Sequence, residues 1–217
     1  MNIDFKKFED KLAEKFDDMS HLVTEDLIRY WFIQSQGLDL GKAEIEKGYK
    51  RIETGIKTVA SRARANLVYD ENAVIEFEFH KGIKTSATCK TTNMGRAFGN
   101  LNKLSMLKDK ERYFIYVFDQ EMQNYYRDNA ANSILFAGNY LKQKIQYKDA
   151  LTQVNTSLKE FKKGAVSFLR KGKHNVNIVF NAIQDYSIEV LYSKEIQRNV
   201  GGKEEGTGFY LIAFKVN

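Results

Sequence analysis

The chain has 217 residues, of which 43% are hydrophobic and 13% aromatic, so it can bury a large core as one domain or one domain with an appendage. A single cysteine, Cys89, excludes a disulfide framework, and three histidines beside it are too few for a zinc-finger type of site. The net charge is +6, and no apolar run approaches the roughly 20 residues that cross a bilayer. We therefore expect a cytoplasmic protein without a membrane partner.

The first predicted element is a helix over residues 24–36. Its apolar side chains recur at the three- and four-residue spacing of a buried helix face: Leu27, Ile28, Trp31 and Phe32. Gly37 is a natural helix end. Glu25 lies at the edge of the apolar stripe, where it either complements the helix dipole or belongs to a site. A strand near residues 43–49 is expected to follow.

An antiparallel hairpin is predicted next, with strands over residues 62–70 and 74–81. Successive side chains of a strand point to opposite faces, so the second strand separates two sets of residues. One face carries groups that can bind metals or protons: Glu76, Glu78 and His80. Phe77 and Phe79 occupy the other face. Any half-exposed amphipathic strand shows the same alternation, so the pattern alone does not establish a site.

The register of this hairpin decides which residue of the first strand joins the polar face. If residues 71–73 form the connection, Asn66 lies opposite Glu78, and Val68 lies opposite Glu76. Asn66 then shares the polar surface. A two-residue turn would instead flip the register and place the opposite set of side chains there.

A second long helix is predicted over residues 93–107. Its buried face has the expected spacing and consists of Met94, Ala97, Phe98, Leu101, Leu104 and Leu107. The other side carries polar and basic groups, which either contact phosphates or form a solvated face: Arg96, Asn100 and Lys103. An apolar strand over residues 112–118 follows, and Asp119 is placed to cap a short helix that ends near residue 128.

The positive charge of the chain is concentrated between residues 139 and 175. Nine basic residues there outnumber two acids, Asp149 and Glu160, so this segment alone carries +7. The basic residues are Lys142, Lys144, Lys148, Lys159, Lys162, Lys163, Arg170, Lys171 and Lys173. We expect this region to be helical, and it either binds a phosphate backbone or forms a solvated helical face.

Three strands are expected to end the chain, over residues 176–182, 187–192 and 209–216, with a mobile glycine-rich loop over 201–208. The order of elements predicts an α/β protein whose mixed β-sheet is flanked by helices. The core would comprise residues 1–138. Residues 139–217 would form a basic helical and β extension packed on the same domain.

This order, with two acids two residues apart in the third strand, resembles the PD-(D/E)XK nuclease superfamily. The resemblance covers roughly residues 20 to 120 and includes three phrases: Thr24-Glu25-Asp26-Leu27-Ile28-Arg29-Tyr30, Ala65-Asn66-Leu67-Val68-Tyr69 and Ile75-Glu76-Phe77-Glu78-Phe79-His80-Lys81. Glu76 matches the second acid of the family motif. Asn66 stands where the family has its first aspartate, and Glu78 stands where it has a lysine.

The resemblance implies a restriction-endonuclease-like fold and a Mg²⁺- or Mn²⁺-dependent endonuclease acting on DNA. Glu76 and Glu78 would bind the metal, with Glu25 or Asp70 completing the set. Asn66 belongs to the same candidate site, and His80 or Lys81 could replace the absent lysine. The candidate DNA-binding residues are Arg96, Lys103, Lys159, Lys162, Lys163, Arg170, Lys171 and Lys173.

Two other functions fit the same sequence. A nuclease fold whose metal site has eroded could serve as a DNA-binding or assembly module that uses the basic segment over residues 139–175. A protein-binding domain without a nucleic-acid role is the third alternative. A homodimer is compatible with each of the three.

Overall fold

A seven-stranded mixed sheet forms the centre of the protein. The computed structural model describes residues 1–19, 23–48, 64–81, 87–107, 109–128, 135–138, 141–154, 159–162, 165–170, 173–179 and 186–217. The strands of this sheet are β1 (Ala43–Gly48), β2 (Arg64–Tyr69), β3 (Ala73–His80), β4 (Glu111–Asp119), β5 (Lys144–Gln146), β9 (Ser187–Val200) and β10 (Lys203–Val216). Their spatial order is β1-β2-β3-β4-β10-β9-β5.

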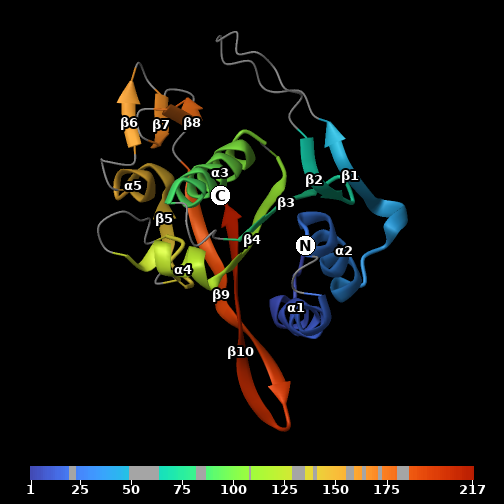
Figure 1. Cartoon of the computed structure of the whole chain (residues 1–217). Helices are drawn as coiled ribbons and strands as arrows, with labels where there is room; N and C mark the ends of the chain where they lie inside the picture. The colour runs from blue at the N-terminus through green and yellow to red at the C-terminus, as the bar shows by residue number, and fades with distance from the viewer. Residues whose placement is uncertain are drawn as a thin grey trace.

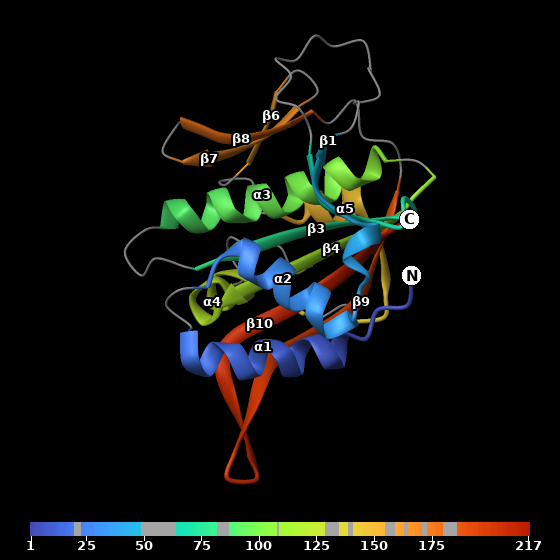
Figure 2. The same cartoon turned by 90° about the vertical axis from the view of Figure 1, so that its right-hand side faces the viewer.

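Helices cover both faces of the sheet (Figure 1). They are α1 (Phe5–Met19), α2 (Glu25–Gln36), α3 (Ala87–Ser105), α4 (Gln120–Arg127) and α5 (Tyr147–Thr152), with a short 3₁₀ turn η1 (Leu40–Lys42). One apolar cluster packs α1 and α2 on one face, and another packs α3, α4 and α5 on the opposite face. Figure 2 shows α1 and α2 lying across the first face. The expected α/β architecture, a mixed sheet flanked by helices, is confirmed.

The predicted hairpin is present as β2 and β3, but its register differs from the prediction. Leu67 pairs with Ile75, and Tyr69 pairs with Ala73, so the strands are offset by two residues from the expected pairing. The reason lies in the turn, where Asp70 and Glu71 adopt φ of 49° and 54°. These left-handed residues close a three-residue connection. Because the offset is even, each side chain stays on its expected face.

Helix α3 connects β3 to β4, which run parallel, side by side in the sheet. A parallel neighbour requires a crossover, and an amphipathic helix is the usual one. Glu78 lies beside Tyr116 and His80 beside Phe118 in this pairing. The crossover therefore lays α3 over the polar face of β3.

The helix predictions succeed where the sequence carries end signals. Thr24 caps α2, since its hydroxyl accepts a hydrogen bond from the Leu27 amide, and Gly37 ends the helix with φ of 60°. Asp119 caps α4 in the same way. Helix α3 begins before the predicted residue 93. Helix α1 was not predicted, although its buried residues have helical spacing: Phe8, Leu12 and Phe16.

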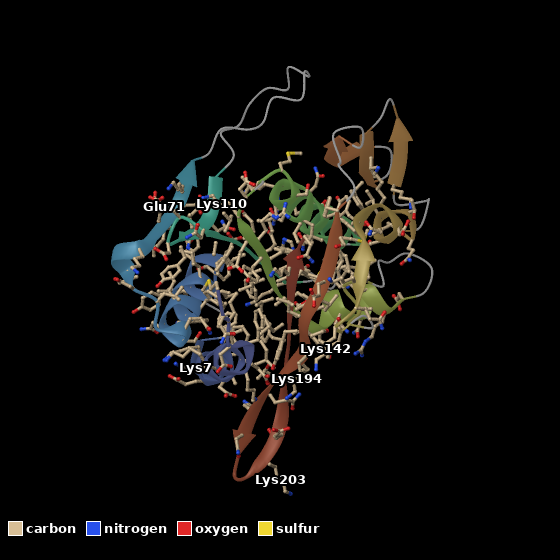
Figure 3. The ribbon with its side chains drawn as sticks, turned by 180° about the vertical axis from the view of Figure 1, so that it is seen from behind. Lys7, Glu71, Lys110, Lys142, Lys194 and Lys203 are labelled. Carbon is tan, nitrogen blue, oxygen red and sulfur yellow. The ribbon has the colours of Figure 1, made fainter. Side chains whose placement is uncertain are left out.

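The glycine-rich segment near the C-terminus is a hairpin turn at residues 201–202 followed by the start of β10, so the expected loop over residues 201–208 is wrong. Gly201 and Gly202 have φ of 59° and 83°, which a tight turn between strands requires. Strands β9 and β10 continue past the sheet as a two-stranded arm, with Lys203 at its tip (Figure 3). Further along, β10 pairs with β4 from Phe209 to Val216. Strands from residues 139–217 thus share one sheet with strands from residues 1–138.

The helical prediction for the basic segment is also wrong. Within its described residues, only α5 is an α-helix, while β6 (Lys159–Lys162), β7 (Ala165–Arg170) and β8 (Lys173–Val179) form a separate antiparallel sheet. The physical reason is the β-branched and aromatic content of these strands, which suits a pleated surface better than a helix. Val166 and Phe168 are fully buried, and the Phe168 ring stacks on Phe98 of α3 at 5.8 Å.

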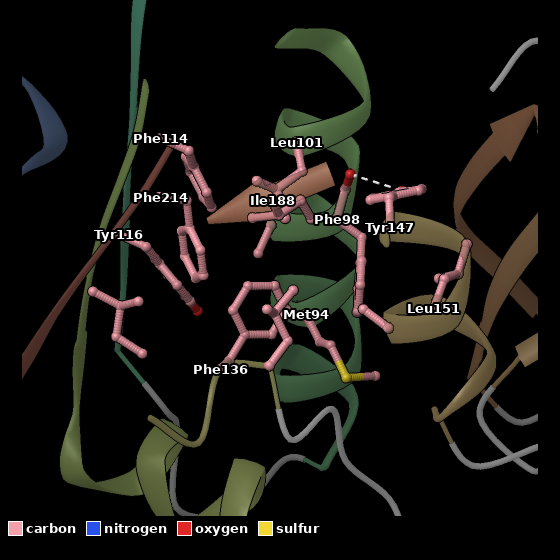
Figure 4. Packing of buried hydrophobic residues seen from close by; sticks show 14 of the residues in the cluster. Met94, Phe98, Leu101, Phe114, Tyr116, Phe136, Tyr147, Leu151, Ile188 and Phe214 are labelled. Atoms are coloured by element: carbon pink, nitrogen blue, oxygen red, sulfur yellow. Dashed lines mark hydrogen bonds between the residues drawn. The ribbon is translucent and has the colours of Figure 1, made fainter. Parts of the chain in front are cut away.

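The apolar cluster between the sheet and α3 is rich in aromatic rings (Figure 4). Phe98 of α3 lies between Phe136 and Tyr147, with centroid distances of 5.1 and 5.9 Å. The Tyr147 hydroxyl donates a hydrogen bond of 3.0 Å to the Phe98 carbonyl oxygen. This packing fixes α3 against the sheet and so positions its polar residues over β3. No helix within the described residues is long and apolar enough to cross a membrane.

Candidate functional site on strand β3

Strand β3 is buried on both faces, and one of these faces is polar. Ile75 and Phe77 pack into the α1 and α2 cluster and are 0% and 1% exposed. Toward α3, Glu76 is 1% exposed and His80 is 5% exposed. Ionisable side chains are rarely buried to this extent unless they are paired. The contacts of these side chains therefore define the candidate site.

Glu76 faces Lys103 of α3. The Lys103 ammonium Nζ lies 2.8 Å from Glu76 Oε1, close enough for an ion pair. The angles fall outside the hydrogen-bonding range, so this buried oxygen accepts no aligned hydrogen bond. Burial raises the pKa of the Glu76 carboxyl to about 7, and the charge of Lys103 opposes part of that rise. The Glu76 carboxyl is therefore partly protonated near neutral pH.

Glu78 and His80 form a second pair on the same face. Glu78 Oε1 lies 2.8 Å from His80 Nε2, and its other oxygen accepts a hydrogen bond from Asn100 of α3. The second ring nitrogen of His80, Nδ1, is hydrogen-bonded to the Tyr116 hydroxyl at 2.9 Å. Tyr116 in turn contacts the Tyr126 hydroxyl at 2.8 Å. A buried polar chain therefore leads from Glu78 into the apolar core.

Asn66 links β2 to two carboxyl groups. Its oxygen Oδ1 accepts a hydrogen bond of 2.8 Å from the Phe77 backbone amide. Its nitrogen Nδ2 donates to Glu25 Oε1 at 3.0 Å and to Glu46 Oε1 at 3.2 Å. In the opposite amide orientation, Nδ2 would face the Phe77 amide and Oδ1 would face the two carboxyl groups, so no hydrogen bond could form with either. The oxygen of Asn66 is therefore engaged by the backbone, and the residue acts as a donor toward the acids.

Glu46 reaches this site through an unusual backbone conformation. It lies within β1 with φ of 54°, a left-handed value that costs a non-glycine residue about 1 to 3 kcal/mol. The Arg29 guanidinium, itself buried, donates a 2.9 Å hydrogen bond to Glu46 Oε1. Burial opposes ionisation of Glu46, but hydrogen bonds from Asn66 and Arg29 outweigh it and lower the pKa. Glu46 is therefore ionised.

Glu25 approaches from the first turn of α2, held there by the Thr24 cap. Burial raises the pKa of its carboxyl to about 7, and the charge of Glu78 adds to the rise, while Arg29 opposes it. The charge of Glu76 contributes in the same direction as that of Glu78. The charges of both acids of β3 therefore raise the pKa of Glu25, although Glu25 comes from a helix on the opposite face of the sheet.

These contacts define an acidic cluster, which consists of Glu25, Glu46, Glu76 and Glu78. Among the described residues two cations contact it, Arg29 and Lys103, so the carboxyl groups there are in excess. In the part of the chain that the structure describes, no three carboxyl, imidazole or thiol groups are arranged to hold a metal ion as they stand. The cluster therefore offers negative charge without a complete ligand set.

Asp70 and Lys81 do not join the acidic cluster. Asp70 is exposed in the turn that precedes β3, and the three-residue rise from Ala73 to Glu76 spans about 10 Å. The Lys81 ammonium lies 5.7 Å from the centre of the Phe79 ring, on the opposite face of the strand. Of the helix stripe, Asn100 and Lys103 contact the acids, whereas Arg96 is exposed to solvent.

The basic residues predicted to bind DNA lie in different structural environments. Lys159 is 5% exposed, and its ammonium donates to the carbonyl oxygens of Leu151 and Thr152 at 3.0 and 2.6 Å. It therefore caps the end of α5 rather than facing a ligand, which corrects the prediction. Three others lie in strands of the small sheet: Lys162, Arg170 and Lys173. Lys163 and Lys171 lie outside the described residues.

Four contributors to the site had not been identified from the sequence: Arg29, Glu46, Tyr116 and Tyr126. Glu46 follows Glu44 in an alternating strand, a weak signal that could have marked it. Tyr116 carries no polar signal, because it lies in an apolar stretch and resembles a core residue, while Tyr126 lies among polar residues that do not distinguish it from a surface tyrosine. Only the packing of β4 and α4 brings their hydroxyls together beside His80.

No protein family, curated protein or solved structure that was compared with this chain matches it.

Proposed function

We propose that the protein is a metal-dependent endonuclease with a restriction-endonuclease-like fold, which hydrolyses phosphodiester bonds of DNA. The observation that carries the proposal is the excess of carboxyl groups around the polar face of β3, with Lys103 beside Glu76. Glu76 is 1% exposed and the Glu78 side chain 15% exposed, and burying two neighbouring carboxyl groups costs stability, so a role in binding a cation accounts for them better than packing does.

The arrangement of elements supports the same proposal. The acids lie on an antiparallel hairpin that is followed by a crossover helix and a parallel strand, with α2 contributing Glu25 from the other face. This is the order in which the superfamily motif occurs in the sequence. Lys103 also supplies, from α3, the positive charge that the family places at the position of Glu78.

A divalent cation fits the residues present. Mg²⁺ keeps several waters and is commonly held by only one or two carboxylates together with substrate phosphates, so an incomplete protein ligand set is no obstacle. Glu76 Oε1 is buried and lies 2.8 Å from the Lys103 ammonium, so the surroundings of this oxygen already accommodate a positive charge. Glu76 and Glu78 would hold Mg²⁺ or Mn²⁺, which when bound neutralises phosphate charge and makes water more acidic.

The protein side chains have separable roles in this proposal. Lys103 places a positive charge beside Glu76, where it stabilises the charge that develops on a phosphate. Glu78, whose other oxygen accepts a hydrogen bond from Asn100, would hold the metal beside His80 and so position the attacking water. Asn66 holds Glu25 and Glu46 in place through its side-chain nitrogen. No covalent bond between enzyme and DNA is required.

Plasmid nicking tests the proposal directly. Supercoiled plasmid incubated with the protein and Mg²⁺ or Mn²⁺ should be nicked, and chelation should prevent it. Glu76→Gln and Lys103→Met should each reduce the rate by about 100-fold or more, the size of a lost electrostatic contact at a reacting phosphate. Glu204→Gln, an exposed acid on the β9–β10 arm, serves as the matched control. The proposal fails if the parent protein does not nick, or if Glu76→Gln nicks equally fast.

A specific observation favours a second function, that of a DNA-binding or assembly module with an eroded metal site. The Asn66 oxygen is engaged by the Phe77 amide, so the position of the first family aspartate offers no metal ligand here. The basic segment, with its charge of +7, would then provide the DNA contacts. This function predicts duplex binding that weakens steeply with salt, without cleavage. Salt-independent binding or none would instead favour the protein-binding domain.

A further inference from the structure

Glu78 Oε1 and His80 Nε2, two atoms that can each bind a metal ion, lie close together without a hydrogen bond between them. They lie 2.8 Å apart, and among the residues that the structure describes Nε2 has no hydrogen-bond partner. His80 is 5% exposed, so this atom is buried. A buried polar atom without a partner is costly, which makes this arrangement informative.

The other nitrogen of the His80 ring is held firmly. Nδ1 is hydrogen-bonded to the Tyr116 hydroxyl at 2.9 Å, and Tyr116 continues to Tyr126 at 2.8 Å. If Nδ1 carries the proton, it donates to Tyr116, and Tyr116 donates onward to Tyr126. Nε2 then presents a lone pair toward Glu78. Histidines that bind metals are oriented in this way, through a hydrogen bond from the nitrogen that does not bind.

We propose that Glu78 Oε1 and His80 Nε2 bind one divalent transition-metal ion that accepts an imidazole ligand, such as Co²⁺ or Zn²⁺. Two ligand atoms at about 2.1 Å from one ion, at roughly a right angle, are separated by about 3 Å. The observed 2.8 Å fits that separation. A shared cation would also satisfy both atoms at once. Water or phosphate completes the coordination.

The Glu78 side chain gives the ion access to the buried nitrogen. Its side chain is 15% exposed, against 5% for His80, so the Glu78 end of the pair is the more accessible one. A small rotation of Glu78 opens the donor pair, and Asn100 contacts only the other carboxylate oxygen. The inference deepens the proposed function, since it rests on the same divalent-ion site. It adds that imidazole selects ions later in the first transition row over Mg²⁺.

Cobalt binding tests the inference without any cleavage assay. The full-length protein is titrated with Co²⁺, and binding is followed by visible absorption and by proton NMR of hyperfine-shifted signals. A bound His80 should give one exchangeable imidazole N–H signal from Nδ1. His80→Gln should lose this signal and bind Co²⁺ more than about 10-fold more weakly. His174→Gln, which removes a histidine from β8, should retain both.

Two more variants keep the test decisive if His80→Gln fails to fold. Glu78→Gln, at a partly exposed position, should also weaken Co²⁺ binding by more than about 10-fold. Tyr116→Phe should keep the N–H signal but speed its exchange with solvent. The inference is overturned if the parent protein binds no Co²⁺ at millimolar concentration, or if Glu78→Gln binds as the parent does. Nicking that requires Glu76 but not His80 would overturn it while leaving the proposed function intact.

Discussion

The two faces of β3 are equally buried but chemically opposite. On one face Ile75 and Phe77 pack among the aromatic rings of α2, and on the other Glu76 and His80 face α3. The first face gains stability from every buried carbon. The second must remove charges from water and recovers that cost only in part, since Glu76 lacks an aligned hydrogen bond. The difference indicates that the apolar face holds the fold together, whereas the polar face exists for another purpose.

The largest effect is expected on the apolar face. Phe77→Ala should lower the free energy of unfolding by about 3 to 5 kcal/mol, because Phe77 is 1% exposed and its ring lies 5.3 Å from that of Phe32. Urea denaturation measures the loss. Glu76→Gln, the neighbouring residue on the other face, is the matched control and should cost far less. Equal losses for the two variants would contradict the division of labour between the faces.

The second prediction concerns the pH dependence of stability, which should come from the polar face. The folded pKa of Glu76 is about 7 against an ordinary value of 4.5, so the folded state holds the proton more tightly than the unfolded state. The parent protein should therefore lose stability as the pH rises from about 4.5 through about 7. For Glu76 this loss is about 3 kcal/mol, from the size of the shift.

Thermal unfolding of the parent and of Glu76→Gln across pH 4 to 8 isolates this contribution. Gln carries no charge at any pH, so the difference in stability between the two proteins should change by the expected amount over that window. Glu25 also has a pKa raised to about 7 and should leave a residual slope of the same sign in the variant. Parallel curves for the two proteins would show that burial does not control the ionisation of Glu76.

The sequence predicts best those features that depend on neighbouring residues. The ends of α2 follow from the Thr24 hydroxyl and from the freedom of Gly37 to adopt positive φ. The alternation in β3 follows from strand geometry and survives the change of register, because an offset of two residues preserves each face. The register itself depended on the backbone of Asp70, which no residue pattern specifies.

The features that the sequence could not predict depend on distant packing. Lys103 could have been a solvated residue of α3, and only the crossover between β3 and β4 lays it over Glu76. Tyr116 reads as a core residue, since its ring is buried and only its hydroxyl is engaged. The basic segment was predicted to be helical from its charged residues, but apolar side chains such as Phe168, which is fully buried, determine its structure.

The third prediction increases the contrast between the faces by placing an acid at position 66. Asn66→Asp removes the two hydrogen bonds donated to Glu25 and Glu46 and adds a negative charge beside them. Without metal, it should lower the free energy of unfolding by about 2 kcal/mol. Adding Mn²⁺ should raise the melting temperature of the variant more than that of the parent, because a tighter site gains more from binding.

Asn66→Ala provides the control for this prediction. It removes the same hydrogen bonds without adding charge, so it should be destabilised but should not respond to Mn²⁺ more than the parent does. If Asn66→Asp is as insensitive to Mn²⁺ as Asn66→Ala, the cluster does not gather around a cation. The polar face would then have a structural explanation after all.

The smallest effect is expected at the cap of α2, the element that connects the two faces. Thr24→Ala removes the hydrogen bond from the Leu27 amide and should cost about 1 kcal/mol. Its more telling consequence concerns Glu25, whose pKa is raised mainly by burial. If the first turn of α2 frays, Glu25 gains solvent and its pKa should fall toward the ordinary value. Carboxyl NMR titration measures this change, and Asp119→Ala, which uncaps α4, is the matched control. An unchanged Glu25 pKa with the expected loss of stability would show that Asn66, rather than the helix cap, holds Glu25 against the acids of β3.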